Sequence, residues 1–390
     1  MQANSPEKNP VVEITGLAHG GHGVGRIDGR VCFVPCVLPG DKVRLRNVRL
    51  TKGVFWGEAD SLLEASPHRT DPPCDVFGVC GGCTWLHFAY PPQAEWKKRI
   101  VSDCLKRIGG IDADVGWTED DSLRLGYRTR AEFHGDDTKI GFYGAWSHDV
   151  VDLDACPLCH PKLNEALGLL RQAKPTCSVE LTVNPDGDEV LAWTKAPNSA
   201  VRKLFPLAQT ERDDAPRHFF HFDGFPVVNG TFSQSSLLLN RVLLRVVREE
   251  LKGAHRVLDL YCGNGNLSAA LPAAVDVSGL DHNRAVVEAA NTVRAGAYRV
   301  GSENDFCRAL RTSAWDSVLL DPPRTGAKAI APDLAKADAS RIVYVSCDPA
   351  TLARDAKVIV QSGWTIARVT AVDMFPNTAH VETVCVFEKN

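Results

Sequence analysis

Three cysteines stand close together in the first quarter of the chain, at a spacing that is typical of metal ligands. Cys74, Cys80 and Cys83 form a C-x5-C-x2-C pattern, and two glycines before Cys83 let the backbone curl so that two thiolates can meet at one centre. A fourth candidate, Cys156 or Cys159, lies much later, and a proline follows Cys156 directly. The pattern indicates an iron–sulfur cluster, with a four-thiolate zinc site and a chance gathering of thiols as alternatives. Spacing alone does not decide which later cysteine completes the set.

Another cysteine, Cys347, is placed like a nucleophile. It follows a buried strand that begins at Arg341 and precedes a helix that Pro349 initiates. A buried structural cysteine is the ordinary interpretation of an isolated thiol. The end of a parallel strand is, however, where open α/β sheets bind ligands, and a helix N-terminus lowers the pKa of a nearby thiol. We therefore expect Cys347 to be a reactive thiolate beside a cofactor site.

The elements that would position this thiol are alternating buried strands and helices, which begin at Arg256 and indicate a doubly wound parallel sheet. The first predicted strand ends in the turn DLYCGNGN, where Gly263 permits close approach of a ligand, and a helix is predicted over Leu267–Ala274. The second strand, Asp276–Leu280, is followed by Asp281, whose carboxylate can accept hydrogen bonds from ribose hydroxyls. Because the turn is only G-x-G, a nucleoside such as S-adenosylmethionine fits better than NAD.

Two further segments carry carboxylates at the ends of predicted strands. A buried strand from Trp315 ends at Asp321, and the two prolines that follow remove competing backbone donors and fix the loop. Near the C-terminus, Glu382 stands at the start of a last predicted strand, Thr383–Glu388. Asp321 thus stands at the C-terminal edge, where open α/β sheets place their ligands.

The N-terminal segment reads as short strands separated by glycines, which predicts a small β-barrel. Within Lys42–Arg46 the period of two places three cations on one strand face and two apolar residues on the other, and Arg49 and Lys52 extend this basic patch. Small barrels that present cations are typical of oligonucleotide-binding modules, and a solvated outer face is the alternative.

Composition limits the remaining possibilities. The chain has 390 residues, 13 cysteines, and 44 Lys and Arg against 48 Asp and Glu, with 24% charged and 44% hydrophobic residues. These proportions exclude a disordered or collagen-like chain, and the length implies two or three domains. The polar start and the lack of any apolar run near roughly 18 residues predict a cytoplasmic protein with reduced thiols and no membrane span.

We predict three domains. They are a β-barrel over residues 1–66, a central α+β domain over 67–225 that carries the cysteine site, and an α/β domain over 226–390. Helical periodicity in the central domain predicts helices over Ala94–Arg107 and Leu163–Ala173.

Taken together, the motifs resemble the S-adenosylmethionine-dependent RNA 5-methyluridine methyltransferases over nearly the whole chain. The motifs are Phe232-Ser-Gln234, DLYCGNGN, DPPRTG, SCDPATLARD and DMFPNTAHVE. The resemblance implies that the barrel is a TRAM domain that binds RNA and that the C-terminal domain is a Rossmann-like methyltransferase. It also implies a 4Fe-4S cluster on Cys74, Cys80, Cys83 and Cys156, because the family's fourth cysteine is the one directly before proline.

The resemblance also implies roles for the candidate site residues. Carried over by motif, the contacts to S-adenosylmethionine are Gln234, Tyr261, Asn266, Asp281 and Asp321. Cys347 would add to C6 of uracil to make C5 nucleophilic, and Glu382 would remove the C5 proton after methyl transfer. A base stacked in RNA cannot be reached in this way, so the target uridine must be extruded or lie in a loop.

Family members with both a barrel and a cluster resemble the ribosomal enzymes, so 23S rRNA is the first expected substrate and the tRNA T-loop the second. No obligate protein partner is evident.

Three features of the sequence depart from the commonest family pattern. Asp281 stands where glutamate is usual, Asp348 where asparagine is usual, and Gly301–Glu303 lacks a clear adenine contact. A carboxylate beside Cys347 would raise the thiol pKa unless it is turned away or paired.

Two other functions are alternatives. An exocyclic-amine methyltransferase would carry an aromatic residue after its proline pair, where this chain has Arg324. A non-catalytic, RNA-binding iron–sulfur redox sensor would have no need of both Cys347 and Glu382.

Overall fold

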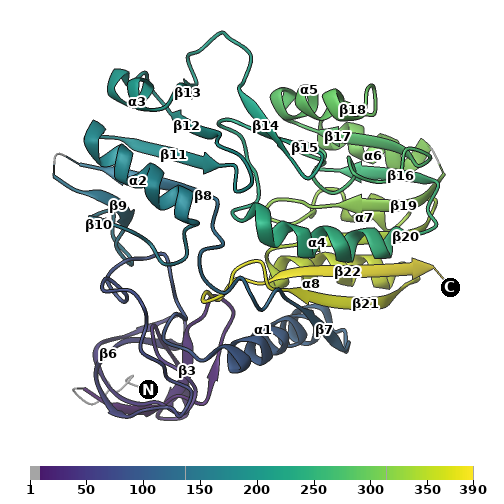
Figure 1. Cartoon of the computed structure of the whole chain (residues 1–390). Coiled ribbons are helices and arrows are strands. Elements are labelled where there is room, and N and C mark those ends of the chain that lie inside the picture. The colour runs from purple at the N-terminus through teal and green to yellow at the C-terminus, as the bar shows by residue number, and fades with distance from the viewer. Residues whose placement is uncertain (1–8, 137, 313, 390) are drawn as a thin grey trace. The chain divides into compact units, whose positions relative to one another are not determined.

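The computed structural model describes residues 9–136, 138–312 and 314–389 (Figure 1). The chain forms two compact units. The first comprises Met1–Ile100 and Asn377–His380, and the second comprises Val101–Pro376 and Val381–Asn390. The three-domain division at residues 66 and 225 stays a prediction.

The first unit contains a six-stranded sheet in the order β1-β5-β6-β4-β3-β2 (Figure 1). Its strands are β1 Val11–Glu13, β2 Gly16–Leu17, β3 Gly23–Ile27, β4 Arg30–Val34, β5 Lys42–Thr51 and β6 Val54–Glu64. The sheet curls around a core that includes Ile14, Val43 and Phe55. A side chain at Gly25 of β3 would come within 2.2 Å of Val12 in β1, so this close approach of the two strands requires glycine.

The alternation predicted for β5 is confirmed. Val43 and Leu45 are buried in the core, while Arg44 and Arg46 point outward and are exposed. Glutamates of β6 neutralise part of the basic face, since Lys42 lies 2.7 Å from Glu64 and Arg46 lies 3.3 Å from Glu58. The net positive charge of the outward face of β5 is therefore smaller than the sequence alone indicates.

The helix predicted over Ala94–Arg107 is present but begins earlier. Helix α1 spans Tyr90–Cys104 and continues into a π-helical turn, η1, over Leu105–Gly109. Gly110 ends the turn in the left-handed region, at φ 69°, where its backbone N–H bonds to the carbonyls of the last turn.

The second unit begins with a central sheet in the order β10-β9-β8-β11-β12-β13. Its strands are β8 Arg130–Gly135, β9 Ile140–Tyr143, β10 Val150–Asp152, β11 Ser178–Val183, β12 Val190–Thr194 and β13 Leu207–Thr210. Helix α2 (Pro161–Ala173) lies against β11, α3 (Ser199–Leu204) follows β12, and a hairpin of β14 (Phe219–Phe222) and β15 (Phe225–Val228) leads onward. The helix predicted over Leu163–Ala173 is confirmed and begins two residues earlier, at Pro161.

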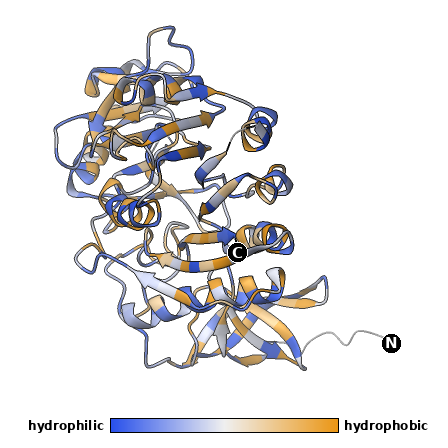
Figure 2. Cartoon of the chain, turned by 90° about the vertical axis from the view of Figure 1, so that its right-hand side faces the viewer, coloured by the Kyte–Doolittle hydropathy of each residue, from blue (hydrophilic) through white to orange (hydrophobic). Residues whose placement is uncertain are grey.

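The same unit contains an eight-stranded sheet in the order β18-β17-β16-β19-β20-β22-β21-β7 (Figure 1). Its strands are β7 Val115–Thr118, β16 Arg256–Leu260, β17 Asp276–Asp281, β18 Tyr298–Val300, β19 Trp315–Leu320, β20 Ala339–Ser346, β21 Trp364–Val372 and β22 Glu382–Lys389. The helices of this region are α4 Leu237–Glu250, α5 Arg284–Val293, α6 Glu303–Thr312, α7 Ala331–Leu334 and α8 Pro349–Gln361. The helices show apolar and polar residues on different faces (Figure 2), as packing against a sheet requires.

Two features of this sheet differ from the sequence-based expectation. The helix predicted over Leu267–Ala274 is wrong, because the segment forms consecutive turns with bonds such as Ser268 N–H to the Gly265 carbonyl. Pro272 lacks a backbone donor and stops any regular helix there. In addition, β7 pairs in parallel with β21 and adds an upstream strand to the sheet. Among the helices that the structure describes, none has the length and apolar character needed to span a bilayer.

Candidate active site

Four predicted site residues meet at one edge of the large sheet. Strands β17, β16, β19 and β20 are adjacent and parallel, so their C-terminal ends lie together. Asp281 ends β17, Tyr261 follows β16, Asp321 follows β19 and Cys347 follows β20. The chain order reverses between β16 and β19, and such a reversal is where doubly wound sheets form a ligand crevice.

Glu382 joins this edge from the opposite direction. Strand β22 runs antiparallel to β20, and Ser346 pairs with Thr383 across the two strands. Cys347 directly follows Ser346 and Glu382 directly precedes Thr383, so the thiol and the carboxyl flank the last pair of the ladder, and the Glu382 charge acts on the pKa of Cys347. The register thus brings together two residues that are far apart in the sequence.

The thiol of Cys347 is neutral in the chain by itself. Burial raises its pKa, and the carboxyls of Glu382 and Asp321 raise it further, to about 12, although the Arg324 guanidinium opposes them. The expectation that the helix N-terminus leaves a low-pKa thiolate is therefore wrong for the ligand-free chain. Desolvation and neighbouring carboxyls outweigh the dipole of α8.

The side chain of Glu382 is buried, and one of its carboxyl oxygens accepts no hydrogen bond from the described residues. Only 2% of the residue is exposed, and within the described residues its Oε1 has no hydrogen-bond partner. Burial, and next the charge of Asp321, raise the pKa of the Glu382 carboxyl well above its usual range, while Arg324 opposes the shift. Burial likewise raises the pKa of Asp321 to about 7. A buried acceptor that lacks a partner is costly, and it points to a ligand that supplies one.

Asp348, the residue beside the nucleophile, faces the helix that follows. Its Oδ1 accepts the backbone N–H groups of Ala350 and Thr351, both at 2.9 Å, and so caps the N-terminus of α8. Its charge is the smallest of the contributions that raise the pKa of Cys347. The departure from asparagine is thus accommodated, since Asp and Asn cap helices about equally well.

The turn after β16 forms the cofactor side of the crevice. Gly263 has φ +54°, and a Cβ placed there would meet nothing within 4 Å, so the backbone stands open to a ligand. Its N–H donates to Asp281 Oδ2 at 2.9 Å, and Asn283 N–H donates to Oδ1 at 2.8 Å. These two bonds orient the Asp281 carboxylate, and each oxygen keeps a lone pair for a further donor.

Tyr261 adopts an unusual backbone conformation at this turn. Its φ is +57°, which is rare for an aromatic residue and indicates a conformation that the surroundings impose. The ring packs edge-on to Phe306 at 5.0 Å, and its hydroxyl donates to Glu303 Oε1 at 3.3 Å. The ring is therefore fixed at the end of β16, beside Asp281.

Asn266 is held by a residue that the sequence did not single out. Its Nδ2 donates to Asn240 Oδ1 at 3.1 Å, and Asn240 Nδ2 donates back to its Oδ1 at 2.6 Å. Asn240 lies on α4 and is fully buried. An amide has two N–H groups and two acceptor sites, so Asn266 retains one of each for a cofactor.

Gln234, 8% exposed, lies on a loop that the central sheet supports. Thr129 N–H donates to the Ser235 carbonyl at 2.9 Å, and Leu237 N–H donates to Thr129 Oγ1 at 3.0 Å. Arg130 of β8 also donates to the Ser233 carbonyl, at 3.1 Å. The start of β8 thus fixes the loop.

A buried network under the DPPRTG loop was not predicted. Asp355 of α8 accepts the Tyr344 hydroxyl at 2.9 Å and the Ala327 N–H at 2.8 Å. Arg354 donates to Asp355 Oδ1 at 2.9 Å and to the Thr325 carbonyl at 2.9 Å. One signal was available in the sequence, because Asp355 is a carboxylate on the otherwise apolar face of a predicted helix.

The four predicted metal ligands are divided between the two units. Cys74, Cys80 and Cys83 are half-buried in the turn-rich part of the first unit, and Cys156 belongs to the second. Within the described ranges, no group of three or more His, Cys, Asp or Glu side chains is arranged to hold a metal ion. Around Cys156, a hydrogen bond from the Cys159 side chain lowers the pKa of the thiol to about 6, against the effect of burial. The cluster prediction is not confirmed by this arrangement.

Comparison with known proteins adds to this geometry. Residues 303–390 match the model of the tRNA (uracil-5-)-methyltransferase family, and residues 11–53 match that of the TRAM domain. A protein of Klebsiella pneumoniae named 23S rRNA (uracil(1939)-C(5))-methyltransferase RlmD is 33% identical, over 97% of this chain and 95% of its own. An uncharacterised RNA methyltransferase of Thermotoga maritima is 30% identical over 97% and 98%. The crystal structure of the Pyrococcus abyssi tRNA (uracil-54, C5)-methyltransferase with S-adenosyl-L-homocysteine superposes with a TM-score of 0.77 at 26% identity, covering 97% and 99% of the two chains.

Proposed function

Because the chain belongs to the family of RNA uracil-C5 methyltransferases with an N-terminal TRAM domain, we propose that Cys347 is its nucleophile, Glu382 its base and 23S rRNA its substrate. The observation that carries the assignment is the end of the β20–β22 ladder at Ser346–Thr383, beside which Cys347 and the buried Glu382 carboxyl with its unused acceptor both stand. Neither a structural cysteine nor a structural glutamate accounts for this pair.

Cys347 and Glu382 carry out different steps of the proposed reaction. The Cys347 thiol loses its proton to solvent, and its sulfur bonds to C6 of uracil, which raises electron density at C5. S-adenosylmethionine supplies an electrophilic methyl group. Glu382 then takes the C5 proton, and the bond between the Cys347 sulfur and C6 breaks to release the base. The raised pKa of Glu382 suits this step, because it makes the ionised carboxylate a stronger base.

The residues around the crevice fit the methyl donor. We assign its binding to Gln234, Tyr261, Asn266, Asp281 and Asp321. Support comes from the open backbone at Gly263 and from the Asp281 carboxylate, which backbone N–H groups orient while lone pairs stay available to ribose hydroxyls. The acidic crevice also favours a cationic ligand.

Ribosomal RNA is the first proposed substrate and tRNA the second. The rRNA proposal is supported by relatives that are 31–33% identical over at least 96% of this chain and are named for uracil 1939 of 23S rRNA. The tRNA proposal is supported by the likeness to the Pyrococcus abyssi enzyme. Mapping 5-methyluridine in RNA from a deletion strain separates them: loss of an rRNA methyl group supports the first, and loss confined to tRNA overturns it.

A 4Fe-4S cluster on Cys74, Cys80, Cys83 and Cys156 remains part of the proposal. It is supported by the C-x5-C-x2-C spacing and by the lowered pKa of Cys156, which favours the thiolate form that iron binds. Reconstitution with iron and sulfide under anaerobic conditions tests it. We expect four iron atoms per chain, and a Cys74→Ser, Cys156→Ser double variant that binds as much iron would overturn the assignment.

Trapping on 5-fluorouridine RNA tests the catalytic proposal. Fluorine at C5 cannot leave as a proton does, so the adduct on the nucleophile should accumulate after methyl transfer. We expect a denaturation-resistant protein–RNA complex that requires S-adenosylmethionine and disappears in Cys347→Ala. Cys385→Ala, at a buried thiol elsewhere on β22, is the matched control and should still form the complex. A complex that persists in Cys347→Ala would refute the role of Cys347.

A further inference from the structure

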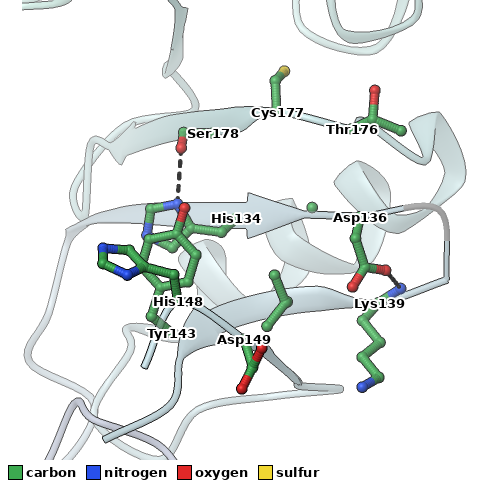
Figure 3. A pocket seen from close by; sticks show the side chains of 11 residues that line it. His134, Asp136, Lys139, Tyr143, His148, Asp149, Thr176, Cys177 and Ser178 are labelled. Carbon is green, nitrogen blue, oxygen red and sulfur yellow. Dashed lines mark hydrogen bonds between the residues drawn. The ribbon is translucent and has the colours of Figure 1, made fainter. Parts of the chain in front are cut away.

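A cavity of about 670 Å³ lies at one end of the central sheet (Figure 3), and none of its lining residues is assigned to catalysis or to cofactor binding. Side chains from the ends of β8 and β9, from the connection between these two strands, from the loop after β9 and from the start of β11 line it. Those that the argument uses are His134, Lys139, Tyr143, His148, Asp149 and Ser178. The volume is in the range of small-molecule sites.

One wall of the cavity is an ordered stack of rings. The rings of His134 and Tyr143 lie parallel, with centroids 3.6 Å apart and planes 6° apart. His134 Nδ1 shares a hydrogen bond of 2.8 Å with Ser178 Oγ, which fixes the imidazole (Figure 3). His148 packs edge-on to Tyr143, with centroids 5.1 Å apart and planes at 70°. The stack therefore presents flat ring faces and edges that are already oriented.

The polar groups of the cavity are those that recognise a nucleotide. Lys139, His148 and Asp149 are exposed, and Ser178 adds a hydroxyl. A second carboxylate, Asp136, is engaged by the turn, since it accepts the backbone N–H groups of Thr138 at 2.8 Å and Lys139 at 2.7 Å. These bonds lower the pKa of Asp136. The ammonium of Lys139 can bind a phosphate, and Asp149 can accept from the N–H groups of a base.

We propose that this cavity binds one unpaired nucleotide of the RNA substrate, with its base against the Tyr143 and His148 rings and its phosphate near Lys139. Unpaired bases are bound in this way by aromatic side chains combined with cations. An apolar peptide or a lipid would need an apolar wall, whereas polar side chains dominate this lining. The inference rests on the proposed function only in taking RNA as the substrate.

The cavity is connected to the loop of Gln234 through strand β8, which indicates a role for the bound nucleotide. The start of β8 holds the loop of Gln234 through Thr129 and Arg130, and His134 stands four residues further along the same strand. At about 3.3 Å per residue, the cavity lies roughly 13 Å along the strand from that loop. A strand does not stretch, so a nucleotide held here sets the distance of the RNA from the cofactor loop. The site is accordingly a positioning site for RNA.

Binding and turnover measurements on two surface variants test the inference. His148→Ala and Lys139→Ala change exposed side chains, so both variants should fold. Loss of a stacked base costs about fivefold to a hundredfold in affinity, and we expect the Kd for full-length RNA substrate to rise by about tenfold in His148→Ala. The rate at saturating RNA should stay as in the wild type. Lys174→Ala, an exposed lysine outside the cavity, is the matched control and should change neither quantity.

Photo-cross-linking identifies the contact directly. RNA that carries 5-iodouridine at single unpaired positions should cross-link to a peptide containing Tyr143 or His148, and Tyr143→Phe should retain RNA affinity because the ring remains. The inference is overturned if Kd is unchanged in both surface variants, or if no position cross-links to residues 134–149. Its failure is distinguishable from that of the proposed function, because Kd and cross-linking are measured without methylation, and the Cys347 adduct is measured at saturating RNA.

Discussion

Asp355 is expected to hold the DPPRTG loop in the conformation that adduct formation requires. It is 1% exposed, and it accepts from Tyr344, from Ala327 and from Arg354. The same loop is tied to α8 by Thr351 Oγ1, which donates to the Arg324 carbonyl at 3.2 Å. Replacing Asp355 by alanine removes the acceptor on which these contacts converge, so both stability and the rate of adduct formation should fall.

The structure sets the size of the effect. Without Asp355, the buried Tyr344 hydroxyl loses its acceptor, which costs about 1–3 kcal/mol. Ala327 N–H keeps a partner, because the Tyr344 oxygen lies 3.0 Å away. Arg354 is about a third exposed, so water replaces much of its interaction. We therefore expect Asp355→Ala to lower the free energy of unfolding by about 2–4 kcal/mol. Asp355→Asn keeps an oxygen for Tyr344 and Ala327 and should cost about half as much.

Two measurements check this prediction. Urea unfolding gives the stability, and single-turnover trapping on 5-fluorouridine RNA gives the adduct rate, which we expect to fall tenfold to a hundredfold in Asp355→Ala, since small misplacements of reacting groups have effects of about this size. The control is Asp316→Asn, because Asp316 accepts the N–H groups of His255 at 2.6 Å and Arg256 at 2.9 Å at the opposite edge of the sheet. It should lose stability and keep the adduct rate. A wild-type adduct rate in Asp355→Ala, or an equal loss in the control, would refute the reasoning.

Three further outcomes follow from the charges of the site. Asp348→Asn keeps a good helix cap but removes a charge that raises the pKa of Cys347, so the pH profile of adduct formation should move to lower pH; a move to higher pH would contradict this. Burial raises the pKa of Asp259 to about 7, whereas the same carboxyl in the unfolded chain loses its proton near pH ~4. The free energy of unfolding therefore falls as the pH rises from about 4 to about 7, because only the folded chain still holds this proton. As the pH rises from about 4 to about 7, Asp259→Asn should therefore gain stability relative to the wild type by a total on the order of 4 kcal/mol, and parallel pH curves of urea unfolding for the two proteins would exclude the effect. Asn240→Leu frees the Asn266 amide and should weaken S-adenosylmethionine binding by about fivefold or more in calorimetry, and an unchanged affinity would show that the pair is dispensable.

Residues at strand ends were predictable because their placement depends on local pattern. Buried runs that end in a carboxylate or in a cysteine identified Asp281, Asp321 and Cys347, and parallel pairing then brings such ends together, whereas Tyr261 rested on the family resemblance. The place of Glu382 rested on the family resemblance. Its position near Cys347 depends on the Ser346–Thr383 pairing, which joins distant segments and leaves no local signal.

The expected pKa of Cys347 was wrong because the charged neighbours of this thiol come from other strands. The pKa of Cys347 was predicted from the helix that follows it, but Glu382 and Asp321 arrive from β22 and β19 and act in the opposite direction. The cap made by Asp348 could have been predicted, because Asp before Pro349 at a helix start is a standard N-cap pattern. The helix expected after the glycine turn failed because Pro272 follows too soon.

The most direct test of the account is the behaviour of Glu382→Gln on ordinary uridine RNA with S-adenosylmethionine. Glutamine keeps the shape of the side chain but cannot accept the C5 proton, so the methylated base should stay bonded to Cys347. We predict a denaturation-resistant complex in Glu382→Gln that carries the transferred methyl group, little complex in the wild type, which turns over, and none in the Cys347→Ala, Glu382→Gln double variant. Turnover of Glu382→Gln at the wild-type rate without a complex would contradict the account.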